Sequence, residues 1–178
     1  TNDLAVPVGG GVTLDGVVTA DEWTGSAVRQ VGAEGAAVRL LQSRGDLLVA
    51  FEAGASWPSG SRLWLGIAPD VPGSGLYVHP AVRVDFEPML HDRPHLLAFR
   101  ISEGGMETPI EGPVARGNAT GPRPAVEIAV PLAALGVTAL TPQALRLVVL
   151  FARGEGLGPV TWPAGISTDG PAGKPPPD

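Results

Sequence analysis

Three histidines form the closest group of metal-ligand side chains in the sequence: His79, His91 and His95. On one strand, four rises of about 3.3 Å would put His91 and His95 about 13 Å apart. Two nitrogens that each bind zinc at about 2.1 Å cannot bridge that distance. Pro94 disfavours a helix that would bring the two together. A metal site therefore requires a bent loop or a hairpin that carries His79 across, completed by Asp85, Glu87 or Asp92; surface or edge histidines are the simpler interpretation.

Oxygen ligands for calcium are available around Asp70. This residue lies in the Pro- and Gly-rich segment 68–75, where its carboxylate and several loop carbonyls could surround a hard cation. The segment lacks the repeated D-x-D-x-D spacing of a dedicated calcium loop. Calcium is therefore a hypothesis for this loop, and an ordinary turn is the alternative.

The sequence contains no recognisable catalytic motif. It has no G-x-S-x-G elbow, no cysteine, no P-loop and no H-E-x-x-H. Paired carboxylates for glycoside hydrolysis could be chosen among Asp85, Glu87 and Glu127, but outward acids on strands are normally solvated. Glu127 lies in an apolar segment, and a buried carboxylate there would need a partner such as Arg100 or Arg146, which predicts a structural ion pair. We therefore expect a protein that is not an enzyme.

Composition restricts the partners. The chain has 178 residues, a formal net charge of −6 and no cysteine, which suits one domain without disulfides. Its basic residues are scattered and form no cluster that could neutralise phosphates, so nucleic acid is not an expected partner. No apolar run approaches the roughly 20 residues that span a bilayer.

The two chain ends carry further expectations. The sequence begins Thr1-Asn2-Asp3 without an initiator methionine, a start typical of a processed secreted protein or of a trimmed chain. Processing is favoured, which predicts a secreted, periplasmic or cell-envelope location in a bacterium. Four prolines between 170 and 178 predict an extended, poorly ordered tail. Residues 1–169 are then expected to form one domain, and the tail is either a chain end or a linker.

Short strands separated by Gly, Pro, Asp and Ser predict an antiparallel β-sandwich of the jelly-roll or immunoglobulin-like kind. The clearest hairpin joins 37–42 and 47–53 through a Gly45-containing turn, with Leu47, Val49, Phe51 and Ala53 toward the core. Further strands are expected at 62–67, 82–87, 95–102, 125–130 and 145–152, with a weaker hairpin within 106–116. Alternation in 82–87 predicts a wet outer face of Arg83, Asp85 and Glu87. A short helix is expected at 131–135, ended by Gly136.

A local signal near the N-terminus predicts one turn of helix. Thr19 and Glu22 have capping-box spacing, in which the Glu22 side chain reaches back to the Thr19 backbone N–H. Val18 and Trp23 hold the two positions of a hydrophobic staple. We therefore expect Trp23 to pack in the core.

Three ordered segments carry a family resemblance. They are Leu14-Asp15-Gly16 with Glu22-Trp23, the strand ending Leu48-Val49-Ala50-Phe51, and the run 126–132 followed by 145–151. Together they resemble the DOMON-like β-sandwich superfamily of family 9 carbohydrate-binding modules and of the haem-binding subunits of dimethylsulfide and ethylbenzene dehydrogenases. The resemblance spans about residues 12–163. It supports a fold more than an activity.

In the sugar-binding branch, the resemblance implies that paired aromatic side chains sandwich a sugar ring and that calcium can support the fold. The ligand candidates are Trp57 and Trp162, each followed by proline, with Trp64 and Tyr77 as further options. An exposed indole can stack on the C–H face of a sugar. Packing of Trp162 and Trp57 on the sandwich is the alternative.

In the haem branch, the resemblance implies ligation by methionine with lysine or histidine. The chain has two methionines, Met89 and Met106, and one lysine, which lies in the tail. Haem is therefore not the favoured cofactor. We expect a non-catalytic module that binds polysaccharide or cell-surface glycan, and the alternatives are a haem-binding electron-transfer subunit or an envelope protein that binds only protein.

Overall fold

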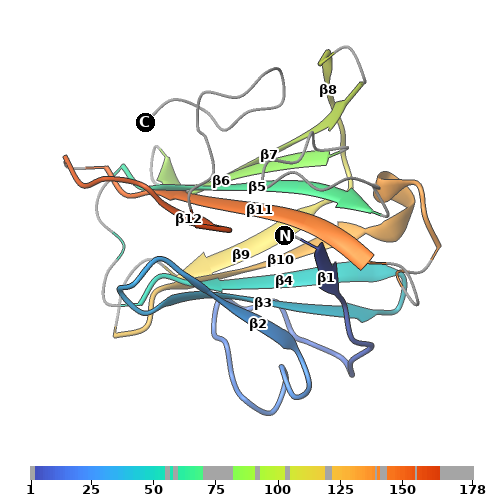
Figure 1. Ribbon diagram of the computed structural model, residues 1–178, viewed down its shortest axis with the longest axis horizontal. Coiled ribbons are helices and arrows are strands. Elements are labelled where there is room, and N and C mark those ends of the chain that lie inside the picture. The colour runs from blue at the N-terminus through green and yellow to red at the C-terminus, as the bar shows by residue number, and fades with distance from the viewer. Residues whose placement is uncertain are drawn as a thin grey trace.

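Two antiparallel β-sheets stacked face to face make up the computed structural model (Figure 1). It describes residues 3–54, 57, 60–69, 82–90, 93–102, 105–118, 122–138, 140, 144–154 and 156–164. The prediction of an antiparallel β-sandwich is confirmed. In the described part of the chain, no helix is long and apolar enough to cross a membrane.

One sheet has seven strands in the order β1-β11-β5-β6-β7-β8, and β12 also pairs with β11. Their bounds are β1 (Asp3–Ala5), β5 (Arg62–Pro69), β6 (Val82–Leu90), β7 (Arg93–Ile101), β8 (Glu107–Pro109), β11 (Ala144–Ala152) and β12 (Val160–Trp162). The other sheet has five strands in the order β2-β3-β4-β10-β9. They are β2 (Ala27–Val31), β3 (Ala36–Ser43), β4 (Asp46–Glu52), β9 (Val114–Asn118) and β10 (Ala125–Pro131), followed by the 3₁₀ helix η1 (Leu132–Leu135).

The core lies between the sheets and follows the period of two that strands impose. Leu47, Val49 and Phe51 of β4 face Leu63, Leu65 and Ile67 of β5 across it, and all six are buried. The predicted inward face of β4 is therefore confirmed. The β3–β4 connection is a two-residue turn at Arg44 and Gly45, with φ of 53° and 82°. Two positive φ values define the hairpin turn for which glycine is suited.

A loop from the N-terminal third covers the outer face of the five-stranded sheet, where Figure 1 shows it as the blue segment below β2 and β3. Trp23 from this loop packs on Leu41, Leu48 and Ala50. The loop has a turn, with Trp23 N–H donating to the Thr19 carbonyl, but no assigned helix. The second face of the β3–β4 hairpin is therefore buried too, which alternation alone does not predict.

Two local predictions are wrong in detail. The predicted hairpin within 106–116 does not form, because β8 pairs with β7 and β9 pairs with β10, in different sheets. The capping box is also incomplete. Glu22 accepts from the Thr19 hydroxyl and from the Thr13 backbone N–H rather than from Thr19 N–H. The predicted short helix before Gly136 is confirmed, and Gly136 has the left-handed φ of 77°.

Candidate functional site

Glu127 holds the N-terminal loop onto the five-stranded sheet. This side chain is completely buried in β10. One carboxylate oxygen accepts the backbone N–H groups of Asp15 and Gly16, each at 3.0 Å, and the other accepts the Trp23 indole N–H at 2.9 Å. The predicted ion pair is therefore wrong, because three N–H donors from one loop satisfy the charge. The residues Leu14-Asp15-Gly16, Glu22-Trp23 and Glu127 thus belong to one structural unit.

Three carboxylates of this unit lie close together. Oxygen atoms of Asp15, Glu22 and Glu127 lie within 4.8 Å of one another. Burial raises the pKa of Glu127, and the N–H groups of Asp15, Trp23 and Gly16 act in the opposite direction. Oxygen ligands of this kind suit a hard cation such as calcium. Because the Glu127 oxygens already accept three hydrogen bonds, the geometry accounts for a structural role without an ion.

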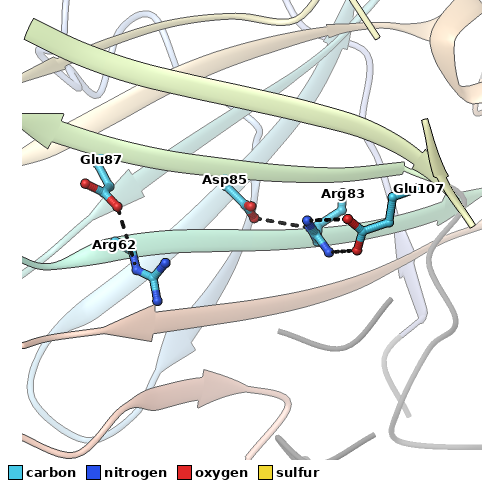
Figure 2. A network of polar contacts seen from close by, with 5 residues as sticks. All are labelled: Arg62, Arg83, Asp85, Glu87 and Glu107. Atoms are coloured by element: carbon cyan, nitrogen blue, oxygen red, sulfur yellow. Dashed lines mark hydrogen bonds and ion pairs between the residues drawn. The ribbon is translucent and has the colours of Figure 1, made fainter. Parts of the chain in front are cut away.

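Charged side chains run along the outer face of the seven-stranded sheet, as Figure 2 shows. Arg83 of β6 makes a two-point pair with Glu107 of the edge strand β8. Arg62 of β5 lies 3.8 Å from Glu87 of β6. Arg83 also stacks over Phe99, with its guanidinium carbon 4.7 Å from the ring centroid. The network ties together β5, β6, β7 and β8.

Asp85 lies in the middle of this network and is only partly satisfied. Among the described residues its nearest cation is Arg83, with Nε 3.4 Å from Oδ1, and neither of these two atoms has a hydrogen-bond partner there. Burial raises the pKa of Asp85 to about 6, against the lowering effect of Arg83 and Arg62. The expectation that 82–87 presents a wet outer face is therefore wrong for Arg83 and Asp85, which are largely covered.

Trp57 is positioned at one end of the sandwich. It is partly buried and packs on the core, with ring centroids 6.0 Å from Phe51, 6.3 Å from Phe86 and 5.0 Å from Phe151. Its indole N–H donates to the Ser61 carbonyl at 3.3 Å. Four contacts from both sheets therefore fix the orientation of this ring.

The strand ends around Trp57 border two hollows. We call this region the Trp57 end; it comprises Trp57 with the strand ends at Glu52, Asn118, Ala125, Arg62 and Ala152. The first hollow, of about 460 Å³, is lined by Gly16, Val17, Val18, Thr19, Ala20, Glu52, Asn118, Pro122, Arg123 and Ala125. The second, of about 420 Å³, is lined by Gly60, Arg62, Ala152, Arg153, Gly154, Gly156, Leu157, Gly158 and Pro159. Hollows of this size with mixed polar and apolar walls are typical of ligand sites.

The other aromatic candidates do not gather around Trp57. Trp162 lies in β12 opposite Val149 and packs, partly buried, on the core. Trp64 lies on the opposite face of the same sheet; it is fully covered, and its indole nitrogen has no hydrogen-bond partner. Its burial leaves no ring face open for stacking. Tyr77 lies outside the described residues.

Of the four predicted metal ligands, only His95 lies among the described residues, so the metal site stays a prediction. His95 is partly buried on β7, opposite Glu87 of β6. Asp70, His79 and His91 lie outside the described residues. Met106, considered for haem, is 72% exposed.

Sequence reasoning missed the polar walls of the two hollows. Glu52, Asn118 and Arg123 line the first hollow and Arg153 lines the second, and no sequence motif marks any of them as a ligand contact. Their common signal is a position at or just beyond a strand end, where binding residues are frequent. A position at a strand end identifies a candidate binding residue only when the strand order shows which strand ends lie side by side.

A two-sheet antiparallel sandwich, with an aromatic ring and two hollows near one end, defines the class of fold and site. Among solved structures, the chain is similar to a family 9 carbohydrate-binding module from Caldicellulosiruptor kristjanssonii, determined in complex with cellotriose. The TM-score is 0.54 at 12% sequence identity, and the alignment covers 88% of this chain and 82% of that one. No protein-family model matches the sequence, and no curated protein matches it either. The likeness establishes the fold that the two proteins share.

Proposed function

We propose that the protein is a non-catalytic carbohydrate-binding module that acts outside the cell, and that Trp57 is its stacking platform. One observation carries the proposal: a partly buried indole is fixed by three phenylalanine rings at the end of the sandwich where strand ends line two hollows with polar walls. A fixed ring loses little conformational freedom when a ligand binds. The flat apolar face of an indole complements the C–H face of a sugar.

The hollows supply the complementary polar contacts. Glu52 is held by Arg39 at 2.7 Å, and Arg153 donates to the Gly158 carbonyl at 2.7 Å. Both donors and acceptors therefore line the hollows, as sugar hydroxyls require. The similar module was determined with cellotriose, so β-linked glucose oligomers are the first ligands to test.

The test is calorimetric titration with cello-oligosaccharides, xylan, mannan and chitin oligosaccharides. We expect binding of cello-oligosaccharides with Kd below about 1 mM. Trp57→Leu, which fills part of the space against the three phenylalanines but has no flat face, should weaken binding at least tenfold. Trp57→Ala should abolish capture on the insoluble polysaccharide.

Trp23→Phe is the matched control for lost stability. It removes the indole donor to Glu127, but Trp23 itself lines neither hollow and keeps an aromatic ring on the outer face of the five-stranded sheet, so binding should persist. Absence of binding to every glycan at millimolar concentration contradicts the proposal. A Soret band in the purified protein would replace it with the haem interpretation.

A further inference from the structure

A chain of hydrogen bonds leads from the β2–β3 turn to the indole of Trp57, and we infer that Ser61 is a positioning residue for this ring. Ser61 sets the orientation of the platform, although its side chain lines neither hollow. The inference rests on the proposed function and deepens it, because it makes the affinity for glycan depend on a residue that does not touch the sugar.

Apolar packing alone does not orient the indole completely. Phe51, Phe86 and Phe151 pack around Trp57, but such contacts do not distinguish the nitrogen edge of an indole from its carbon edge. The N–H is the one polar group of the ring, and it donates to the Ser61 carbonyl at 3.3 Å. Because hydrogen bonds are directional, this contact determines which edge of the indole faces Ser61.

The bond between Trp57 and Ser61 is sensitive to small movements. Its length of 3.3 Å lies just beyond the usual range of about 2.7–3.2 Å for an N–H···O bond. A further shift of about 0.3 Å in the carbonyl would break it by that geometric criterion. The orientation of the platform therefore depends on how firmly Ser61 is held.

The Ser61 hydroxyl holds this residue in place. Ser61 is 2% exposed, and its Oγ donates to the Arg153 carbonyl at 2.7 Å. Arg62 and Ala152 form the last residue pair between β5 and β11, so Ser61 and Arg153 occupy the next position along the two strands. The hydroxyl thus continues the pairing of β5 with β11 by one step and fixes the carbonyl that Trp57 uses.

Arg153 is itself anchored on two sides. Its Nε donates to the Gly158 carbonyl at 2.7 Å, and its Nη1 pairs with Glu34 of the β2–β3 turn. The Glu34 backbone packs closely on the chain after β4, where a Cβ at Gly54 would lie 2.8 Å from the Glu34 carbonyl oxygen. Contacts from both sheets therefore hold the residue that accepts the Ser61 hydroxyl.

This arrangement has a direct consequence for binding. A ring that already has its binding orientation loses little conformational freedom when the ligand arrives. Side chains that contact a ligand are held in this way by packing and by hydrogen bonds from a surrounding layer of residues. Loss of the Ser61 hydroxyl should therefore loosen the indole while the phenylalanine rings keep it at the end of the sandwich.

Hydrogen exchange of the Trp57 indole N–H tests the inference in the ligand-free protein. The chain has four tryptophans, and the indole signal that is absent from the NMR spectrum of Trp57→Leu identifies this one. Ser61→Ala keeps the carbonyl acceptor but removes the hydroxyl, so the Trp57 indole N–H should exchange about tenfold faster.

The Trp23 indole is the internal control for a general loss of stability. Its N–H donates to Glu127 and should exchange in Ser61→Ala as it does in the parent. Unchanged exchange at Trp57 overturns the inference. Equal acceleration at Trp57 and Trp23 also overturns it, because the hydroxyl would then stabilise the whole fold rather than position one ring.

Glycan affinity gives the second test. In calorimetry with cellohexaose, Ser61→Ala should raise the Kd about fivefold, the loss expected from one hydrogen bond. Ser61→Thr retains the hydroxyl and should bind within about twofold of the parent. Ser102→Ala is the matched control: it removes a hydroxyl that accepts the Met106 N–H at 3.0 Å, away from Trp57, and should bind as the parent does.

The outcomes separate the two proposals. An unchanged Kd in Ser61→Ala overturns the inference while the proposed function stands. Absence of glycan binding in the parent overturns the proposed function, and the exchange rates alone then decide whether Ser61 positions the ring.

Discussion

Two carboxylates on the outer faces of the two sheets, Glu127 and Asp85, have different surroundings: Glu127 is completely buried and Asp85 is partly buried. Glu127 accepts three N–H groups and holds the N-terminal loop. Asp85 has Arg83 at 3.4 Å, but its Oδ1 makes no hydrogen bond, and its pKa is raised to about 6. Burial opposes ionisation in both residues. The comparison shows that well-aligned N–H donors allow a covered carboxylate to hold a loop in place. A nearby cation without hydrogen-bond geometry does not offset the free energy lost when the carboxylate is desolvated.

Removing the indole that Glu127 binds should have the largest effect. Trp23 is 2% exposed, so Trp23→Ala should lower the free energy of unfolding by about 3–5 kcal/mol, as large core truncations do. Chemical denaturation measures the change. Glycan binding of the remaining folded fraction should be unaffected. A fully stable variant that loses its ligand would show that Trp23 belongs to the binding site.

Replacing Glu127 should lower the free energy of unfolding somewhat less than Trp23→Ala does. Glu127→Gln keeps the shape but sets an amide N–H₂ against donors, which leaves buried N–H groups unsatisfied. We expect a loss of about 3 kcal/mol in unfolding free energy at neutral pH. Faster hydrogen exchange at the amides of Asp15 and Gly16 should accompany it. Unchanged hydrogen exchange at these two amides would argue that Glu127 does not hold the N-terminal loop.

The smallest effect concerns Asp85 and appears as a pH dependence. Its folded pKa of about 6 lies above the ordinary value of 3.8, so its contribution to stability is fully present below about pH 4 and is lost as pH rises through 6. The free energy of unfolding should fall by about 2 kcal/mol from pH 4 to 7, and Asp85→Asn should remove that part. Glu127, whose pKa burial also raises, should contribute to the residual slope, and the double variant should have a smaller slope than Asp85→Asn alone. An unchanged slope in Asp85→Asn contradicts the assignment.

Local patterns predicted the parts of the fold whose causes are local. The β3–β4 hairpin follows from its alternation and its Arg44-Gly45 turn, and η1 follows from Pro131 and Gly136. The segment 106–116 was misassigned because its strands are short and their partners lie in different sheets. Propensity cannot identify a non-local partner.

The candidate site was harder to predict for a related reason. The type of Trp57 suggested a platform, but its three phenylalanine neighbours come from β4, β6 and β11. The partners of Glu127 were mispredicted because two are backbone N–H groups, which every sequence contains. The burial of Asp85 depends on which residues cover the outer face of the sheet. Strand alternation predicts the face to which a side chain points but not whether that face is covered.

The separation in sequence between Glu127 and its donors has a consequence for folding order. The three hydrogen bonds join residues 104 to 112 positions apart, and contacts of such range form slowly because a long loop must close first. During synthesis from the N-terminus, Trp23 emerges well before β10 exists to receive it. Its indole can pack on the β3–β4 hairpin soon after synthesis, but its N–H has no acceptor until Glu127 is made, so the closing of these three hydrogen bonds marks a late step in maturation.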